Sequence, residues 1–338
     1  MKRKSFFCLS ISSALLAALC LGVGSAPAQE KLRIPVAAPA STSSLVEQLA
    51  VYQGWFKELG YDARIYSVSG GESAAVLALE KGRLPFFNSD DNIALAIKPK
   101  SNIKVVASTR NKLLYYLVAG KHVKSYKDLP QTNIRVGISS PTSANVYVSL
   151  SLLEKNGIKN PRLIKVGGSS ARLAAVKAGK VDVGSLTLGP MLKAKEAGLT
   201  ILGSASEVTG EFLMMQVAMN KKWVEKNPKK AVEFVGTYIR GCEFINNPRN
   251  REKVIEVLTG PMKNKPKIAK AMYDINVVKE KEFPRYCQFT EKGIREYIKA
   301  AKWSKAIDPD LKVPPISAFT LPDLHKKGLA WYKKRYER

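Results

Sequence analysis

The sequence predicts an α/β protein of two lobes, each an open sheet flanked by helices, with a ligand cleft between them. From residue 31 onward, short apolar runs alternate with amphipathic stretches, which is typical of open α/β sheets. In addition, GGSSARLAAVKAGKVDVG from Gly167 repeats GGESAAVLALEKGRLPFF from Gly70 without a gap, at a constant offset of 97 residues. Any α/β protein repeats such units, but two gapless copies favour two lobes of one design.

The expected elements follow this pattern along the chain. Hydroxyl residues such as Ser43 or Ser44 mark helix starts, and glycines such as Gly60 mark helix ends. Expected strands cover residues 31–38, 61–68, 102–109, 113–120, 200–205 and 212–220, and another ends near residue 138. Expected helices cover residues 43–60, 188–199, 221–247, 248–260, 266–276, 291–304 and 321–338; a long helix follows residue 143, and each Gly-Gly unit adds one.

The order of these elements predicts how the chain divides between the lobes. Lobe 1 is expected to hold residues 29–112 and 213–338, and lobe 2 residues 113–212, because the chain becomes helical after the strand FLMMQVAMN. Two crossings, near residues 110–116 and 209–215, would then join the lobes. Two crossings form a hinge, and a cleft beside a hinge is where a small ligand binds.

The first 28 residues have the form of a signal peptide. Basic residues at 2–4 precede an apolar stretch over 6–23, and small residues lead up to Ala28. An uncleaved anchor and a lipoprotein cut before Cys20 are the alternatives. No second apolar span follows, and the residue before Cys20 is larger than lipoprotein sites prefer. We therefore expect cleavage after about Ala28 and export to the periplasm.

Cysteine and histidine usage limits the chemistry that we expect. The mature chain keeps Cys242 and Cys287, which in an oxidising compartment form either one disulfide or two buried thiols. His122 and His325 are the only histidines, and neither CxxC nor HExxH occurs. Residues of the metal-ligand types do not cluster in the sequence, and no GxxxxGK[ST] is present. We expect no metal site, no nucleotide, no other cofactor and no histidine-based catalytic triad.

The chain is strongly basic, with a formal net charge of +27 from 55 Lys+Arg against 28 Asp+Glu. The basic residues are spread along the chain, many on the polar faces of the C-terminal helices. For an exported protein, such a charge favours contact with an anionic membrane or attraction of anionic solutes, and no nucleic-acid partner is expected.

The loop GISSPTSAN is the strongest candidate for ligand contact. A strand ends near residue 138 and a helix begins just after it, so Ser139, Ser140, Thr142 and Ser143 offer hydroxyls beside unpaired helical N–H groups. A helix N-terminus favours a carboxylate, sulfonate or phosphate. Ser41, Thr42 and Ser43 stand at the corresponding helix start of lobe 1. The alternative for both loops is that the hydroxyls only cap a helix and shape a turn.

Further candidates lie in the two repeat units and at a crossing. Gly70, Gly71 and Ser169 stand where the backbone can approach a ligand closely, although tight turns alone also select glycine. Asn88, Ser89 and Asp90 follow the first unit, and Asp90 aligns with Thr187 of the second. Asp90 either caps a helix or selects an amine, hydroxyl or amide donor. Arg110 is either a solvated hinge arginine or a bidentate partner for a carboxylate. Trp55, Phe86 and Phe87 are expected in the core.

These segments, in this order, resemble a known family. The shared stretches are QGWFKELG, SGG, YKDL…IRVGISSPTSANVYVSLSLLEKNGI, AAVKAGKVDVG and NKKWVEKNPKKAVEFVGTYIRGCEFINNP. The chain is similar to solute-binding proteins of ABC importers in the nitrate, sulfonate and taurine group, which also resemble the thiamine-pyrimidine synthesis proteins. The resemblance covers nearly all of the mature chain and implies the type II periplasmic binding fold. The chain departs from the family at Pro85, where members usually carry an acidic residue like the aligned Asp182 of the second unit. It also lacks the cysteine-rich motif of the pyrimidine synthases.

The resemblance implies a monomeric binding protein that closes on a small ligand and delivers it to an ABC permease in the inner membrane. Two hydroxyl-rich helix starts and the positive charge favour an organic anion, a carboxylate or sulfonate, as the ligand. One alternative is an enzyme, or a precursor-binding protein, like the pyrimidine synthases; no nucleophile–base pair in the sequence supports an enzyme. The other is a binding protein that presents its ligand to a membrane receptor.

Overall fold

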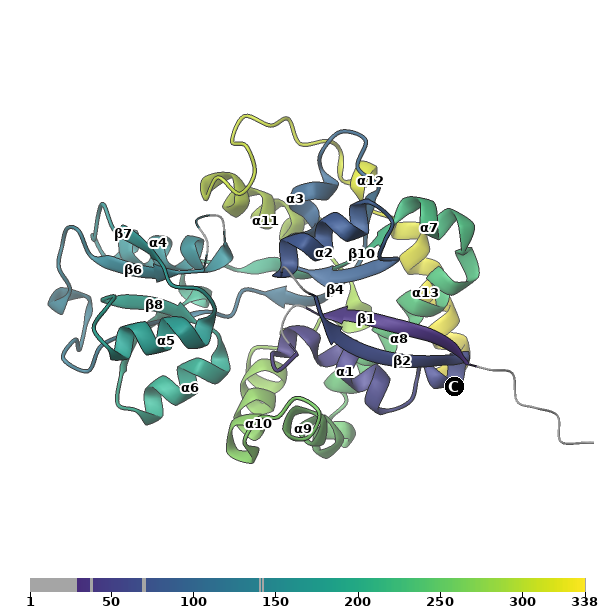
Figure 1. Ribbon diagram of the computed structural model, residues 1–338, viewed down its shortest axis with the longest axis horizontal. Helices are drawn as coiled ribbons and strands as arrows, with labels where there is room; N and C mark the ends of the chain where they lie inside the picture. The colour runs from purple at the N-terminus through teal and green to yellow at the C-terminus, as the bar shows by residue number, and fades with distance from the viewer. Residues whose placement is uncertain (1–28, 37–38, 69–70, 140, 142, 338) are drawn as a thin grey trace, which may run out of the picture.

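The computed structural model describes residues 29–36, 39–68, 71–139, 141 and 143–337. Figure 1 shows two bodies, a smaller one around β5–β9 and a larger one that holds both ends of the described chain. We call the larger body lobe 1 and the smaller one lobe 2. The predicted signal peptide and the site candidates Gly70, Ser140 and Thr142 lie outside the described residues.

Lobe 1 contains two small sheets in place of one. Parallel strands β1 (Glu30–Val36) and β2 (Tyr61–Ser67) form the first. In the second, β10 (Glu211–Asn220) lies between β3 (Phe86–Ser89) and β4 (Ile103–Lys112) and runs antiparallel to both. In the described part of the chain, the two sheets are not joined by strand pairing between β1 and β3. Proline, which has no amide donor, stands at position 35 in β1 and at position 85 just before β3.

Lobe 2 contains one sheet of five strands in the order β7-β6-β8-β5-β9. The first three are parallel, and β5 runs antiparallel to both of its neighbours. Their bounds are β5 Tyr116–Ala119, β6 Arg135–Ile138, β7 Arg162–Lys165, β8 Val183–Leu186 and β9 Thr200–Ser204. Asp182, just before β8, accepts hydrogen bonds from the backbone and side chain of Arg135, which ties the central strands together.

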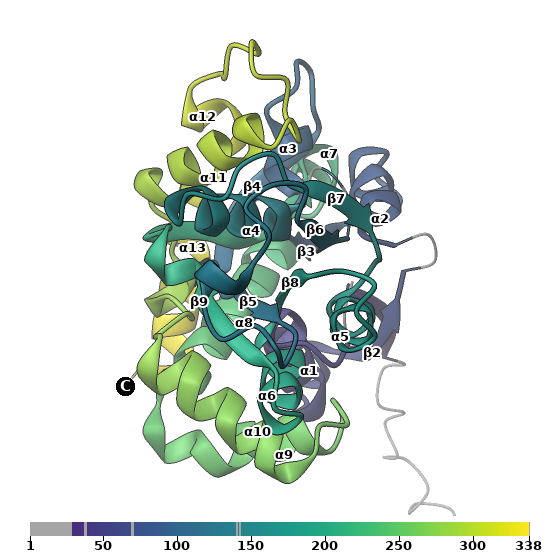
Figure 2. The same cartoon turned by 90° about the vertical axis from the view of Figure 1, so that its left-hand side faces the viewer.

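Helices cover the sheets of both lobes (Figures 1 and 2). The stretch expected as one helix over 43–60 is divided into a 3-10 turn at Thr42–Ser44, helix α1 and a second 3-10 turn, and Gly60 ends it with a φ of 89°. The helices are α1 Leu45–Tyr52, α2 Gly71–Glu80, α3 Asn92–Ala96, α4 Ala144–Lys155, α5 Ser169–Lys177, α6 Leu188–Glu196, α7 Lys221–Lys226, α8 Pro228–Asn246, α9 Arg251–Thr259, α10 Pro266–Met272, α11 Glu291–Trp303, α12 Ile316–Phe319 and α13 Pro322–Tyr336.

The core of lobe 1 forms around α8. A Cβ at Gly236 of α8 would come within 2.2 Å of the Trp331 ring of α13, so glycine is required for these two helices to approach. The expected core residues Trp55, Phe86 and Phe87 are buried. Cys242 of α8 and Cys287 form a disulfide, which decides between the two alternatives that the sequence left open.

The chain passes between the lobes at two places, from β4 to β5 through residues 113–115 and from β9 to β10 through residues 205–210. Helices of lobe 1 also reach lobe 2 on both sides. Lys267 of α10 pairs with Glu196 of α6 at 3.3 Å, and the ring of Trp303 in α11 contacts that of Tyr147 in α4. Within the described residues, no helix combines the length and the apolar character needed to cross a membrane.

Candidate functional site between the lobes

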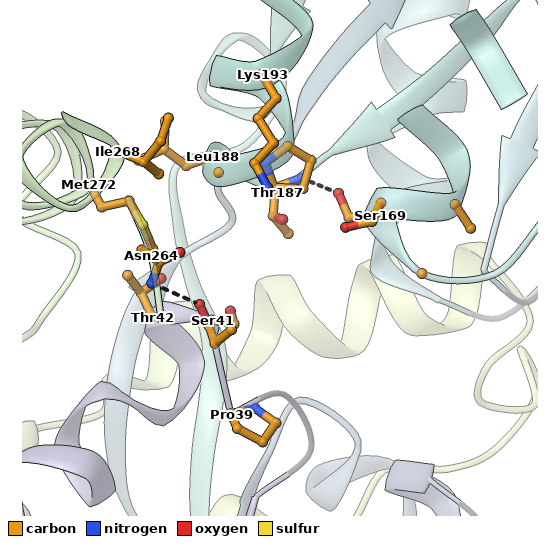
Figure 3. Close-up of a pocket in the computed structure, with 16 residues that line it drawn as sticks. Pro39, Ser41, Thr42, Ser169, Thr187, Leu188, Lys193, Asn264, Ile268 and Met272 are labelled. Atoms are coloured by element: carbon orange, nitrogen blue, oxygen red, sulfur yellow. Dashed lines mark hydrogen bonds between the residues drawn. The ribbon is translucent and has the colours of Figure 1, made fainter. Parts of the chain in front are cut away.

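A cavity of about 590 Å³ lies between the two lobes (Figure 3). Its walls come from three parts of the chain: the turn before α1, the starts of α5 and α6 in lobe 2, and helix α10 with the loop before it. The lining residues are Pro39, Ala40, Ser41, Thr42, Gly168, Ser169, Ser170, Ala171, Thr187, Leu188, Gly189, Pro190, Lys193, Asn264, Ile268 and Met272. Polar groups therefore face the cavity from both lobes, and α10 adds apolar side chains.

The wall from lobe 1 is a turn held by its own hydroxyls. Ser41 caps the 3-10 turn, and its Oγ accepts the N–H of Ser43 at 3.3 Å. Thr42 is buried, and its Oγ1 accepts a hydrogen bond from Asn276 at 3.3 Å. Asn264 donates to the carbonyl of Ala40 at 3.4 Å, so the segment before α10 is tied to the same turn. These bonds fix the turn before any ligand is bound.

The wall from lobe 2 brings two helix N-termini to the cavity. Gly168 is the N-cap of α5 and Thr187 that of α6, and neither residue caps its helix with a side chain. The Oγ of Ser169 accepts the N–H of Thr187 at 2.9 Å, which joins the two starts. Lys193 extends along α6 toward Thr187 (Figure 3). The N–H groups of a first helical turn have no acceptor within their helix, and together with an ammonium they favour an anion here.

Lobe 1 repeats the Ser169–Thr187 contact with an acidic residue. Glu72, at the position equivalent to Ser169, accepts the N–H of Asp90 at 3.3 Å, and Asp90 is equivalent to Thr187. Glu72 also accepts the hydroxyl of Ser89 at 2.6 Å. The two repeat units therefore share one backbone device, the tie between a helix start and the end of the next strand.

Three carboxylates gather at this point of lobe 1. Oxygens of Glu72, Asp90 and Asp91 lie within 4.8 Å of one another, all partly buried. This corrects the expectation that residues of metal-ligand type do not cluster, because the fold of α2 and β3 joins residues that are separated in sequence. Burial, followed by the charge of Glu72, raises the pKa of Asp90 well above its ordinary value and that of Asp91 to about 6. Burial and then Asp90 raise the pKa of Tyr115 to about 12.

Arg110 lies in a buried ion pair. Its guanidinium contacts the Glu282 carboxylate at 2.6 Å, and the two side chains are 7% and 0% exposed. The prediction of a solvated hinge arginine is therefore wrong, because the segment after the π-helix Tyr273–Lys279 supplies a partner 172 residues away. Burial raises the pKa of Glu282, and Arg110 acts against that shift.

In the 139–143 loop, the structure describes the hydroxyls of Ser139 and Ser143, which bond to each other and to Asn145. Ser139 donates to Ser143 at 2.7 Å, and the Asn145 amide donates to both. In lobe 1, Asn88 has a similar internal role, since its amide donates to Thr109 at 3.0 Å and to the carbonyl of Ser43 at 3.2 Å.

Four of the predicted residues meet in the cavity, and others do not. Ser41, Thr42, Ser169 and Thr187 line it. Ser43, Gly71, Asn88, Ser89, Asp90, Arg110, Ser139 and Ser143 are not among the lining residues. Sequence reasoning missed Lys193, Asn264, Ile268 and Met272, which carry no local pattern. It also missed Glu72, although the 97-residue offset to Ser169 was a usable signal.

A family model described as NMT1/THI5 like matches residues 42–251. This span is more than half of the chain and includes both Gly-Gly units. The chain belongs to the NMT1/THI5-like family. Membership confirms the resemblance found in the sequence. Among curated proteins, the chain is similar to the nitrate import ATP-binding protein NrtC of Synechococcus elongatus. The two are 24% identical over 155 residues, which is 43% of this chain. The chain spans 23% of the length of NrtC.

Solved structures similar to this NMT1/THI5-like protein share its fold over most of its length. The putative sulfonate-binding protein SsuA of Methylobacillus flagellatus is 16% identical, with a TM-score of 0.67 and coverage of 92% of this chain and 97% of that one. The periplasmic nitrate-binding protein NrtA of Synechocystis is 14% identical, with a TM-score of 0.64 and coverage of 92% and 90%. The ligand-binding component of an ABC-type import system from Staphylococcus aureus is 15% identical, with a TM-score of 0.70 and coverage of 89% and 99%. The fold is that of the periplasmic binding proteins.

Proposed function

We propose that this protein is the extracytoplasmic solute-binding component of an ABC importer. The observation that carries the proposal is the cavity between the lobes, in which two helix N-termini of lobe 2 face a hydroxyl-bearing turn of lobe 1. Family membership and the fold support it, because relatives with this fold are named as nitrate- and sulfonate-binding proteins or as import components.

The ligand is a small organic anion, a carboxylate or sulfonate. Its acid group lies at the starts of α5 and α6, near Ser169, Thr187 and Lys193. Backbone N–H groups at a helix start bind an oxyanion without needing a buried cation. The strongly positive net charge adds long-range attraction for an anion.

Glu72, Asp90 and Asp91 do not line the cavity, so the ligand would have to extend beyond that lining to meet them. Its far end would then carry a hydrogen-bond donor such as an amine, hydroxyl or amide. Asp90 and Asp91, with their raised pKa values, lie in lobe 1 at the position equivalent to the anion-binding end of lobe 2. An acid that shares a proton with its neighbours accepts a donor, and it repels a second carboxylate. Ligand contacts of Ser43, Gly70, Gly71, Asn88, Ser89, Arg110, Ser139, Ser140, Thr142 and Ser143 stay predictions.

Transport requires export and a membrane partner. We propose that the protein works as a monomer in the periplasm after cleavage near Ala28 and delivers its ligand to an inner-membrane permease. The disulfide between Cys242 and Cys287 supports an oxidising compartment. Binding would close the two lobes about the crossings, and small-angle scattering should show a smaller radius of gyration with ligand than without.

Mass spectrometry of the compound that co-purifies with the protein tests the proposal, followed by calorimetry with that compound. A single carboxylate or sulfonate that rebinds unchanged is the expected result. A cationic ligand would contradict the anion site. Chemical conversion of the bound compound would instead support an enzyme of the pyrimidine-synthase kind and overturn the transport role.

A further inference from the structure

A second pocket lies on lobe 1 at the end of the sheet that points away from the cleft. Strand β4 starts at Ile103 beside this pocket and ends at Lys112 beside the crossing to lobe 2. The pocket, of about 500 Å³, is formed by the loop after α3, the starts of β4 and α7, and the segment that leads into α12. In Figure 1, α3, α7 and α12 lie on the side of lobe 1 remote from α5 and α6.

Five lysines and no carboxylate line this pocket among the residues described. They are Lys98, Lys100, Lys104, Lys221 and Lys312. Lys104 is partly buried, and its ammonium donates to the carbonyl of Ala318. Burial and then the charge of Lys221 lower the pKa of Lys104, so the ammonium groups are close enough to repel one another. An anion in the pocket would relieve that repulsion.

Two acids beside the pocket, Glu80 and Glu225, have partners, and Asp310 stands next to the lining residue Leu311. Glu80 accepts hydrogen bonds from the hydroxyl of Ser101 at 2.8 Å and the N–H of Asn102 at 3.0 Å, so its carboxylate ties the loop to α2. Glu225 pairs with Lys221 at 3.8 Å, and both side chains are more than half exposed. Lys98, Lys100 and Lys312 are exposed and have no ion pair in the part of the chain that the structure describes.

A neighbouring hollow extends the positive surface. It shares Asn102 with the first pocket and is lined by Lys81, Lys222 and Lys226, with Glu80 as its acid. Lysines that serve one small anion need not extend over two hollows. A surface that presents many phosphates side by side matches this arrangement, because each lysine near an anionic bilayer adds to the electrostatic attraction.

We call the lysines of these two hollows the lysine edge of lobe 1; they are Lys81, Lys98, Lys100, Lys104, Lys221, Lys222, Lys226 and Lys312. We propose that this lysine edge binds phosphate groups, and that these are the phosphodiesters of an anionic phospholipid surface. Because the edge lies at the opposite end of β4 from the crossings, contact with a membrane there leaves the cleft accessible. The proposal is independent of the solute that the cleft binds.

Vesicle sedimentation with the mature protein tests the proposal. The triple variant Lys98→Gln, Lys100→Gln and Lys312→Gln is compared with a variant of equal net charge on lobe 2, Lys159→Gln, Lys177→Gln and Lys180→Gln, which changes exposed lysines outside the pocket. On vesicles of phosphatidylglycerol and phosphatidylcholine, the pocket variant should bind about a hundredfold more weakly, and the control within about threefold of wild type. Both variants should keep the wild-type unfolding midpoint and affinity for the cleft ligand.

Three outcomes would overturn the proposal. Equal weakening in both variants would mean that net charge alone attracts the membrane. Equal binding of wild type to vesicles of pure phosphatidylcholine would remove the need for anionic lipid. Calorimetric binding of inorganic phosphate or pyrophosphate at the lysine edge, with no vesicle binding, would assign the pocket to a free anion.

Discussion

The two repeat units have the same backbone arrangement and different chemistry. In each lobe, the residue after the Gly-Gly pair accepts the N–H of a residue 18 positions later. Lobe 1 makes this tie with Glu72 and Asp90, and lobe 2 makes it with Ser169 and Thr187. The comparison teaches that the fold requires an acceptor at this position and leaves its charge free. The unit of lobe 2 lines the cavity, where Lys193 adds a charged donor, whereas Glu72 and Asp90 lie outside the lining.

The units differ again three residues further on. Lobe 2 has Arg172, which is buried and donates to the carbonyl of Ser185 at 2.8 Å and that of Gly167 at 2.6 Å. Lobe 1 has the buried Ala75 at the equivalent position. The Gly-Gly turn of lobe 2 is thus fixed by a side chain that lobe 1 lacks.

The largest expected effect comes from making lobe 2 resemble lobe 1 at this position. Arg172→Ala should lower the free energy of unfolding by about 3 kcal/mol, because two hydrogen bonds from a charged donor are lost in a buried place. Urea denaturation measures it. Arg172→Lys should recover part of the loss, and the exposed control Arg162→Ala should change little. A loss below about 1 kcal/mol for Arg172→Ala would show that other donors satisfy the two carbonyls.

The carboxylate cluster of lobe 1, Glu72, Asp90 and Asp91, should make the stability of the protein depend on pH. The pKa of Asp91 is raised to about 6 in the folded protein. The folded state therefore holds more protons than the unfolded state as pH rises from about 4 to 6, and stability falls across that window, by about 2 kcal/mol. Glu47, whose pKa burial raises to about 7, acts in the same direction. Unfolding curves at several pH values should be flatter for Asp91→Asn; parallel curves would remove Asp91 as a cause.

Removing the positive charge of Lys193, in the lobe 2 wall of the cavity, should weaken ligand binding. Lys193→Gln should raise the dissociation constant of the co-purified ligand about tenfold, because a charged hydrogen-bond donor at the cavity is lost. Lys195→Gln, on the same helix but outside the lining, is the matched control. Calorimetry that finds the two variants equal would place the acid group elsewhere.

The hydroxyls of the loop in lobe 2 are expected to contribute less. Replacing Ser140 or Thr142 with alanine should weaken binding by about 1 kcal/mol each, and somewhat more if the acceptor is charged. Ser206→Ala, which removes an exposed hydroxyl from the crossing that follows β9, should leave the dissociation constant as it was. Unchanged affinity in both loop variants would restrict the anion site to the starts of α5 and α6.

The smallest expected effect is that of a chelator. Dialysis against it should leave ligand affinity unchanged, because we propose that the carboxylates of Glu72, Asp90 and Asp91 serve a donor on the ligand and hold no cation. A fall in affinity that calcium or zinc restores would assign the acidic cluster to a metal ion.

The sequence determined the features that depend on neighbouring residues. Periodicity, glycines and capping hydroxyls predicted most strands and helices, since these signals act within a few residues. The gapless repeat predicted that the two Gly-Gly units face each other across the cleft. Among the described residues, only the unit of lobe 2 lines the cavity, where it lies with Ser41 and Thr42 of the turn before α1. The same repeat aligned Glu72 with Ser169, so the difference in charge between the two repeat units was already present in the sequence.

The tertiary structure decided what depends on segments far apart in the chain. Arg110 has its partner in Glu282, and the α10 wall of the cavity comes from residues 264–272. The disulfide likewise joins residues 45 positions apart. No local pattern carries these pairings, because packing brings the groups together and burial then sets their energies. Burial also raises the pKa of Asp90 and Asp91, which as exposed residues would be ordinary acids.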